Sequence, residues 1–275
     1  MNKSREKNME SYELSHLEKI EQIDLAKVGL QRYTGLNVED FGKYIILCNF
    51  KHYMKSFAEH YGVKINGEDR AMQVATANNI SLINFGMGSP NAASIMDLLT
   101  AITPKACLFL GKCGSLKSKI NVGDFIVPIG AIRGEGTSDD YLDPRVPSLP
   151  AFALERAVSH IIKQYKQDYY SGVIYTTNRR FWEHDEAFKT RLVTMKATGI
   201  DMETATILTV GFKNDIPTGA LLLVSDEPMT SKGIKTENSD KKVTKEYGLL
   251  HLKIAVDTLK QLINTGESVK HLKDW

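Results

Sequence analysis

The chain has 275 residues, of which 42% are hydrophobic and 25% charged, and its formal net charge at pH 7 is +2. This composition predicts a globular protein with a substantial core. The near balance of charge excludes a polyanion groove of the kind that binds nucleic acid, while a small anionic ligand is compatible with it. No run approaches the roughly 18 apolar residues of a membrane span, and the charged start has no apolar signal segment. Cys48, Cys107 and Cys113 lie in or beside apolar runs, as reduced, buried thiols do, so we expect a cytoplasmic protein without disulfides.

Short apolar, β-branched runs alternate with longer amphipathic segments after a polar extension over residues 1–20. The alternation predicts one three-layer α/β/α domain, residues 21–275, around a largely internal sheet. The expected strands lie near residues 44–48, 80–85, 106–110, 124–129, 172–175 and 218–224.

Two helices have clear sequence signals. Ser89 and Pro90 supply an N-cap and a first-turn proline for a helix that continues to residue 99. Apolar residues recur at three- and four-residue spacing at positions 243, 247, 250 and 254, which predicts a last helix with Ser239 or Asp240 as its N-cap.

The segment AIRGEGTSDDY, residues 131–141, combines one arginine, Arg133, with glycines, hydroxyls and carboxylates, a mixture that strands and helices do not need. It follows a strand-like run and is typical of a loop that handles a polar ligand. The alternative is a solvated loop whose charges serve solubility.

Glycine-rich segments follow two other predicted strands. In the first, Gly86, Gly88 and Ser89 precede a helix whose free amides attract anions, although a tight strand-to-helix turn explains the glycines equally well. In the second, Lys112 stands between Gly111 and Gly114, so backbone and ammonium can approach the same anion.

Two acidic segments complete the set. Glu203, next to Met202, precedes an apolar helix; its carboxylate either caps that helix or accepts hydrogen bonds from a sugar's vicinal hydroxyls. Ser225 and Asp226 end a buried strand, where poor solvation raises the pKa of a carboxyl and suits it to donate a proton. An ordinary turn aspartate is the alternative.

Aromatic and basic residues adjoin one another in the run TNRRFWE at residues 177–183. Phe181 and Trp182 are placed to stack on a planar base or to pack in the core, and Arg179 and Arg180 to pair with phosphate or face water. The seven histidines show no HExxH spacing and the cysteines no CxxC, so we expect no metal and no other cofactor.

In chain order, the segments GMGSPNAA, GKCGSL, VGDFIVP, DMETA and SDE resemble the nucleoside phosphorylase and nucleosidase superfamily over residues 44–262. The segments RYTG at residues 32–35, INFGMGSPNAASIMDLL at 83–99 and AIRGEGTSDDYLDPRVPSLPAF at 131–152 are similar to the catalytic part of the AMP nucleosidases. The resemblance implies a mixed, partly barrel-like sheet, hydrolysis of AMP to adenine and ribose 5-phosphate, and a homohexamer.

The resemblance also implies roles for individual residues. Asp226 takes the place of the general acid that protonates the leaving base, with Ser225 beside it. Glu203 and Met202 match ribose contacts, and Phe181 with Trp182 fall in the base-stacking segment. Gly86, Gly88 and Ser89 match the glycine loop beside the sugar.

Departures from the phosphorylases of this superfamily favour water as the nucleophile. The two arginines that hold orthophosphate there are absent from LCNFKH at residues 47–52 and FLGKCG at residues 109–114. Lys112 and Arg133 are then available for a substrate 5′-phosphate, with Arg179 or Arg180 as alternatives. The group that activates water stays open among Glu135, Asp139, Asp140 and Glu183.

Two other functions compete with AMP hydrolysis. A purine or pyrimidine nucleoside phosphorylase is the nearest within enzymes, and the missing arginines count against it. A non-catalytic nucleotide sensor is the other, and it would not require a positioned acid such as Asp226 together with Glu203.

Overall fold

The computed structural model describes residues 20–230 and 237–269 of the chain. A helix over residues 20–34 precedes the main fold. The strands are β1 Tyr44–Cys48, β2 Gln73–Ala77, β3 Ile80–Asn84, β4 Ala106–Ser115, β5 Phe125–Gly134, β6 Tyr169–Thr177, β7 Gly199–Asp201 and β8 Thr218–Asp226. The helices are α2 Lys51–Tyr61, α3 Ser89–Leu98, α4 Phe152–Gln164, α5 Glu186–Thr194, α6 Thr204–Lys213 and α7 Glu237–Thr265, with short 3₁₀ turns at Val38–Asp40, Leu99–Ala101 and Thr137–Asp140.

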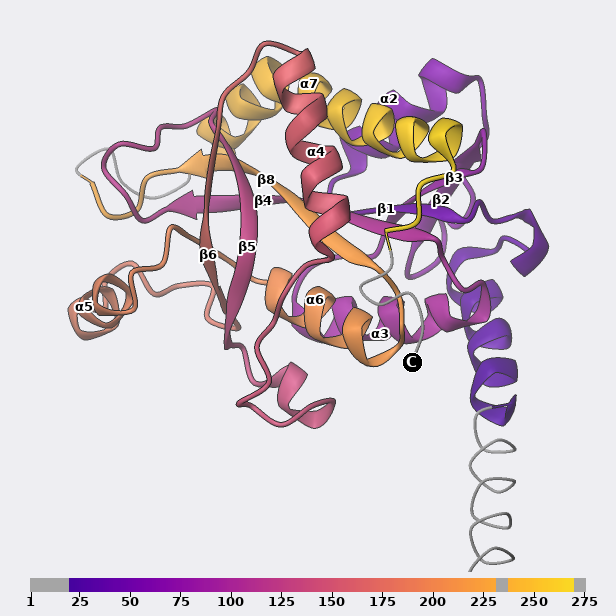
Figure 1. Ribbon diagram of the computed structural model, residues 1–275, viewed down its shortest axis with the longest axis horizontal. Coiled ribbons are helices and arrows are strands. Elements are labelled where there is room, and N and C mark those ends of the chain that lie inside the picture. The colour runs from indigo at the N-terminus through magenta and orange to yellow at the C-terminus, as the bar shows by residue number, and fades with distance from the viewer. Residues whose placement is uncertain (1–19, 231–236, 270–275) are drawn as a thin grey trace, which may run out of the picture.

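The eight strands form one mixed sheet in the order β2-β3-β1-β4-β7-β6-β5-β8. A further pairing of β4 with β8 closes the last part of this order, β4 to β8, into a barrel. In Figure 1, α2, α4 and α7 cover one face of the sheet, while α3 and α6 cover the other. The predicted α/β fold with a mixed, partly barrel-like sheet is confirmed.

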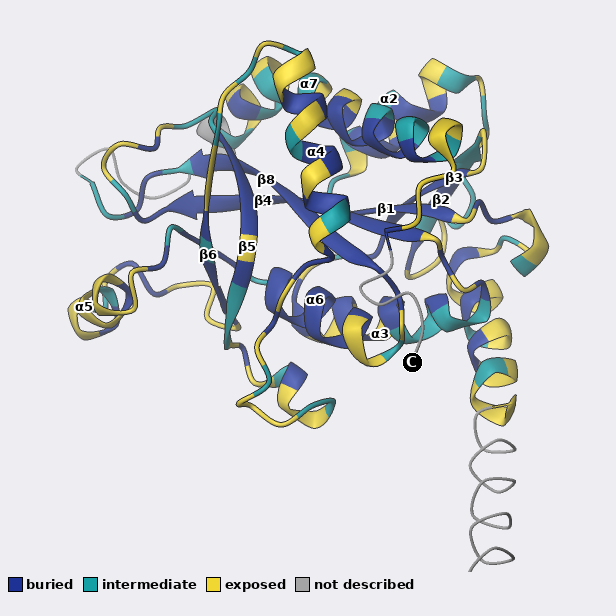
Figure 2. Cartoon of the chain, viewed as in Figure 1, coloured by how far each residue is buried: buried dark blue, intermediate teal, exposed yellow. Residues whose placement is uncertain are grey.

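Two hydrophobic clusters hold the layers together, one on each face of the sheet. Along β1, Tyr44, Ile46 and Cys48 belong to the first cluster, and Ile45 and Leu47 to the second. Successive side chains of a strand point to opposite faces, so a strand between two helical layers must be apolar at every position. Figure 2 shows the result, with buried strands between helices whose outer faces are exposed.

Several predicted boundaries were wrong. Lys112 and its neighbouring glycines belong to β4, which continues to Ser115, because β4 pairs with β8 as far as Gly114 and with β7 at Gly114 and Ser115. Residues 131–134 of the predicted loop belong to β5. Gly88 rather than Ser89 is the N-cap of α3, and Asp240 lies inside α7, which begins at Glu237.

Other predictions lie partly or wholly outside the described residues. The predicted polar extension, residues 1–20, lies outside them except for Ile20. The side chain of Ser239, one of the two predicted N-cap residues, also lies outside them.

Glu155 of α4 is a buried carboxyl outside the pocket described below. Its Oε1 accepts a hydrogen bond from the backbone N–H of Ala220 in β8, at 2.7 Å, and its Oε2 is buried without a hydrogen-bond partner. Burial raises the pKa of Glu155 well above 4.5, because the charged form loses its hydration. The carboxyl therefore helps to anchor α4 to β8 in its protonated form.

We expect Glu155→Gln to change the pH dependence of stability. Glu155 is protonated in the folded chain at pH values where it is ionised in the unfolded chain, so its contribution is present below the unfolded pKa and is lost as pH rises towards the folded pKa. The wild type should lose up to about 1.4 kcal/mol per pH unit in that window relative to the variant. Urea unfolding of both proteins from about pH 5 to about pH 8 measures the difference; parallel stability curves would contradict it.

Candidate functional site

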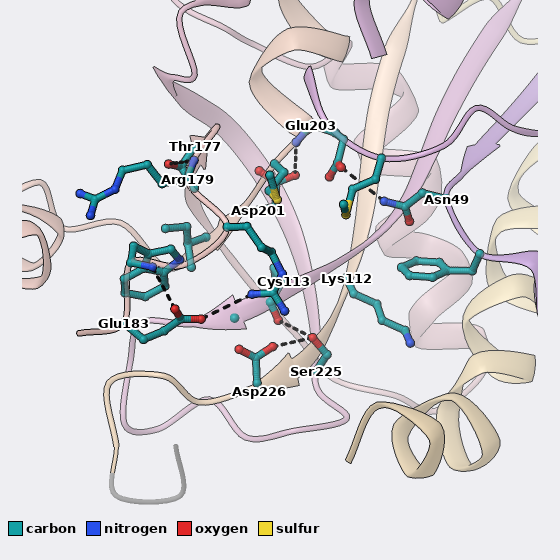
Figure 3. Close-up of a pocket in the computed structure, with 17 residues that line it drawn as sticks. Asn49, Lys112, Cys113, Thr177, Arg179, Glu183, Asp201, Glu203, Ser225 and Asp226 are labelled. Atoms are coloured by element: carbon teal, nitrogen blue, oxygen red, sulfur yellow. Dashed lines mark hydrogen bonds and ion pairs between the residues drawn. The ribbon is translucent and has the colours of Figure 1, made fainter. Parts of the chain in front are cut away.

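A pocket opens where β1, β4, β6, β7 and β8 end, and Figure 3 shows its side chains. Strand ends in α/β sheets gather backbone turns and polar side chains, which is why ligands bind there. The lining residues are Asn49, Phe50, Met87, Lys112, Cys113, Gly114, Thr177, Arg179, Arg180, Trp182, Glu183, Ile200, Asp201, Met202, Glu203, Ser225 and Asp226.

Asp201, the last residue of β7, lines the pocket and accepts hydrogen bonds from the residues around it, a set of bonds that we call the Asp201 clamp. Its Oδ1 accepts a hydrogen bond from the Thr176 hydroxyl at 2.7 Å. Its Oδ2 accepts hydrogen bonds from the Thr204 N–H at 2.8 Å, the Thr204 hydroxyl at 2.5 Å and the Glu203 N–H at 3.3 Å. These bonds fix the turn from β7 into α6 and so fix the backbone that carries Met202 and Glu203.

Glu203 lies beside this clamp and faces the pocket. Its Oε1 accepts hydrogen bonds from the Gly88 N–H at 2.7 Å and from the Asn49 side-chain amide at 3.4 Å. Burial, together with the nearby charge of Asp201, raises the pKa of Glu203 to about 8. A carboxyl that lines the pocket can accept hydrogen bonds from ligand hydroxyls.

The glycine loop before α3 holds Glu203 and Met202 by hydrogen bonds. Gly88 has φ of 93°, a conformation that L side chains rarely adopt, and this turns its N–H towards the carboxyl. The Ser89 hydroxyl donates to the Met202 carbonyl at 2.7 Å. The glycine loop therefore positions Met202 and Glu203, while Gly86, Gly88 and Ser89 are not among the lining residues.

Asp226 ends β8 at the opposite side of the pocket floor. The Ser225 hydroxyl donates to its Oδ1 at 2.6 Å. Gly114 of β4 pairs with Asp226, and a Cβ at Gly114 would lie 3.1 Å from Asp226 Oδ2. A glycine here lets the carboxyl lie directly over the adjacent strand.

The segment after β6 forms a further wall. Glu183 is buried; its Oε2 accepts a hydrogen bond from the Trp182 N–H at 2.9 Å, and its Oε1 lies 3.5 Å from the Arg180 guanidinium. Trp182 packs against Phe188 of α5, with ring centroids 5.6 Å apart. Arg179 is 2.8 Å from Asp185, the N-cap residue of α5.

Lys112 lies at the edge of the pocket beside Phe50, with its ammonium turned towards α7. It is 2.7 Å from Asp240 Oδ1 and 2.8 Å from the Thr244 hydroxyl, and it lies 4.5 Å from the centroid of the Phe50 ring. In this structure the ammonium is therefore held by protein groups of α7.

Most of the residues predicted from the sequence meet in this one pocket: Lys112, Arg179, Trp182, Met202, Glu203, Ser225 and Asp226. Phe181 does not line it and has 83% of its surface exposed. Arg133 does not line it either, because its guanidinium donates to the Ser138, Leu142, Asp143 and Val146 carbonyls, to the Ser138 hydroxyl and to Asp139. It ties together the loop that follows β5.

Of the four candidates for activating water, Glu183 lines the pocket and the other three do not. Glu135 is buried, and its Oε1 accepts hydrogen bonds from the Thr206 hydroxyl and the Ser138 N–H. Asp139 pairs with Arg133, and Asp140 is exposed in the same turn.

Asn49 is a site residue that the sequence reasoning did not select. It follows the buried strand β1, and this position after a strand was the available signal. Its Nδ2 donates to Glu203, and its Oδ1 is buried without a hydrogen-bond partner.

Within residues 20–230 and 237–269, no group of three or more His, Cys, Asp or Glu side chains is arranged to hold a metal ion. Over the same residues, no helix combines the length and apolarity needed to cross a bilayer.

A family model described as the phosphorylase superfamily matches residues 43–260. An AMP nucleosidase of Escherichia coli strain K12 is 28% identical over 263 residues, covering 78% of this chain and 54% of the relative, so the chain spans about half of that relative's length. The crystal structure of an AMP nucleosidase from Bacteroides thetaiotaomicron VPI-5482 is 49% identical, with a TM-score of 0.79, covering 90% of this chain and 100% of the other. A uridine phosphorylase structure from Vibrio fischeri ES114 shares the fold at 22% identity, with a TM-score of 0.73, covering 82% of this chain and 95% of its own.

We expect Asp201→Asn to lower the pKa of Glu203 from about 8, because the neighbouring negative charge disappears. The pKa should stay above the ordinary glutamate value, since burial remains the larger cause. Carboxyl ¹³C chemical shifts across a pH titration measure it directly. An unchanged Glu203 titration would show that Asp201 does not carry charge beside it.

Proposed function

Because the chain belongs to the phosphorylase superfamily, we propose that this pocket hydrolyses the N-glycosidic bond of AMP to adenine and ribose 5-phosphate. The observation that carries the proposal is the placement of Asp226 and Glu203 on opposite sides of one pocket (Figure 3). Cleavage builds negative charge on the departing base and oxocarbenium character on the sugar. An acid for the base and a carboxyl for the sugar meet both needs.

In this proposal Asp226 protonates the imidazole nitrogen of the departing adenine. The hydrogen bond that the Ser225 hydroxyl donates to Oδ1 holds this carboxyl in one orientation at the pocket. Glu183 lies on the same side of the pocket in Figure 3, which suits its carboxylate to accept a hydrogen bond from the adenine amino group. Trp182 forms the wall against which the base lies.

The ribose lies against Met202, and its hydroxyls donate to Glu203. Two backbone features keep Glu203 in place, the Asp201 clamp and the Gly88 N–H, so the carboxyl is already oriented before substrate binds. Such preorganisation lets it hold the sugar hydroxyls without reorganisation during the reaction.

Arg179 and Arg180 are the pocket-lining cations best suited to the 5′-phosphate. The Arg180 side chain is 44% exposed and lies 3.5 Å from Glu183, a longer pairing than the 2.7 Å between Lys112 and Asp240. Binding by Lys112 would require it to exchange Asp240 for phosphate. Binding by Arg133 would require the loop after β5 to release it.

A cytoplasmic location and a homo-oligomer, a hexamer by family resemblance, belong to the same proposal. Three free, buried cysteines fit a reducing compartment. Phe181, which is largely exposed beside the site, fits a surface that a second subunit covers.

The decisive assay incubates the purified protein with AMP and, separately, with adenosine, each with and without orthophosphate, and identifies the sugar product. Phosphate-independent release of adenine and ribose 5-phosphate from AMP supports the proposal. Phosphate-dependent ribose 1-phosphate from adenosine would replace it with a phosphorylase, and tight AMP binding without turnover would replace it with a sensor.

We expect Asp226→Asn to lower kcat for AMP by about 10²- to 10⁴-fold, because the amide cannot protonate the leaving base. Asp168→Asn is the control, since Asp168 is a surface carboxylate paired with Lys163. Thermal unfolding of both variants tests the fold. Near-normal turnover in a folded Asp226→Asn protein would remove Asp226 from the mechanism.

We expect Arg180→Gln to raise the KM for AMP by roughly ten- to a hundredfold, because a charge-assisted hydrogen bond to phosphate is lost. Binding of adenosine, which has no phosphate, should change little. Arg145→Gln is the matched control, because that side chain is 91% exposed and does not line the pocket. An unchanged KM for AMP would place the phosphate elsewhere.

A further inference from the structure

The proposed reaction, on which this inference rests, sets where its nucleophile enters. The attacking atom reaches the sugar carbon from the face opposite the departing base. If Asp226 meets the base and Glu203 the sugar hydroxyls, the nucleophile arrives from the end of the pocket away from Asp226. In Figure 3 that end carries Asn49 and Lys112, and Phe50 also lines the pocket there. We call it the nucleophile end.

Lys112 is the pocket-lining cation at the nucleophile end. Side chains alternate along β4, so Lys112 shares a face with Leu108 and Leu110, whose hydrophobic cluster includes residues of α7. The ammonium therefore extends towards α7, where Asp240 and Thr244 accept its hydrogen bonds. Only 3% of the Lys112 side chain is exposed, so its charge is offset by protein rather than by water.

The charges around the nucleophile end are thus already balanced. Lys112 and Asp240 carry opposite charges, and burial together with the charge of Lys112 lowers the pKa of His52 to about 4, so that imidazole is neutral at pH 7. Glu203 and Asp201 in the pocket lining are carboxyls. Orthophosphate is a mixture of monoanion and dianion at neutral pH, and binding either form would require positive charge or several free donors. Water needs neither.

We propose that Asp240 is a specificity-determining residue that neutralises Lys112 and thereby excludes orthophosphate from the nucleophile end, so that water attacks the sugar. The residue lies 128 positions from Lys112 in the chain and acts through it. Removing the carboxylate while keeping the ammonium should turn the nucleophile end into an anion site.

The test measures orthophosphate binding by calorimetry to protein saturated with a C-nucleotide analogue of AMP, whose carbon–carbon glycosidic bond cannot be hydrolysed. The analogue fills the base and sugar-phosphate positions and leaves the nucleophile end open to water or to added phosphate. The wild type should show no measurable binding, and Asp240→Asn should bind phosphate at least about tenfold more tightly than the weakest binding that the calorimeter detects. The double variant Lys112→Met with Asp240→Asn should lose that gain, because the cation is gone.

Asp257→Asn is the matched control, since Asp257 also lies on α7 but pairs with Tyr165 and does not line the pocket. Phosphate affinity in Asp240→Asn that equals the wild type, or a gain that survives in the double variant, would overturn the proposal. Phosphate binding to the wild-type complex with the analogue would overturn it without any variant, even if Asp240→Asn did not fold. Failure of the proposed function is seen separately, as absence of phosphate-independent AMP hydrolysis by the wild type.

Discussion

The pairing of β4 with β8 is the constraint on which the rest of the site depends. It closes the barrel and sets Gly114 beside Asp226, with a register shift between Cys113 and Gly114. The shift interrupts the regular hydrogen bonding of β4 with β8 where the two strands reach the pocket. Polar side chains therefore follow the buried apolar residues of both strands there. A site built on paired strands holds its groups more rigidly than one built on loops alone.

Asp201 and Glu203, two neighbouring acidic residues of the site, differ in how the protein holds them. Asp201 uses both oxygens on hydroxyls and backbone amides, which compensates for its burial, whereas Glu203 receives two donors and keeps capacity for a ligand. Burial raises the pKa of both, in Glu203 to about 8. The two carboxyls differ in the number of hydrogen bonds that they accept from the protein. Asp201, which accepts more, stabilises the fold, and Glu203, which accepts fewer, is available to a ligand.

Much of the fold could be predicted from the sequence, because buried strands have a strong local signal. β1 was predicted at its observed bounds, since five consecutive apolar residues have no place outside a two-sided core. β7 has only three residues, and β2 carries Gln73 and Thr76, so neither stands out from its surroundings. The superfamily predicted from the ordered motifs is confirmed by the match over residues 43–260.

The pairing of charged side chains could not be predicted. Lys112 and Arg133 were both expected to be available for a phosphate, but the sequence around Lys112 contains no sign of Asp240, which another helix supplies. Arg133 is captured more locally, by carbonyls between Ser138 and Val146 that any residue type would provide. Every residue type has a backbone carbonyl, so the sequence does not indicate which carbonyls will accept the hydrogen bonds of an arginine. The folded loop is needed to identify them.

The wall that carries Trp182 has a small hydrophobic cluster of its own, separate from the two clusters that join the layers. It consists of Leu116, Tyr175, Trp182, Phe188, Leu192, Ala197 and Ile200. The free energy needed to unfold this wall locally is therefore set by the few contacts of the small cluster and not by the main core. Amide protons of α5 should therefore exchange with solvent through a local opening, one that leaves the barrel and its two acidic residues in place.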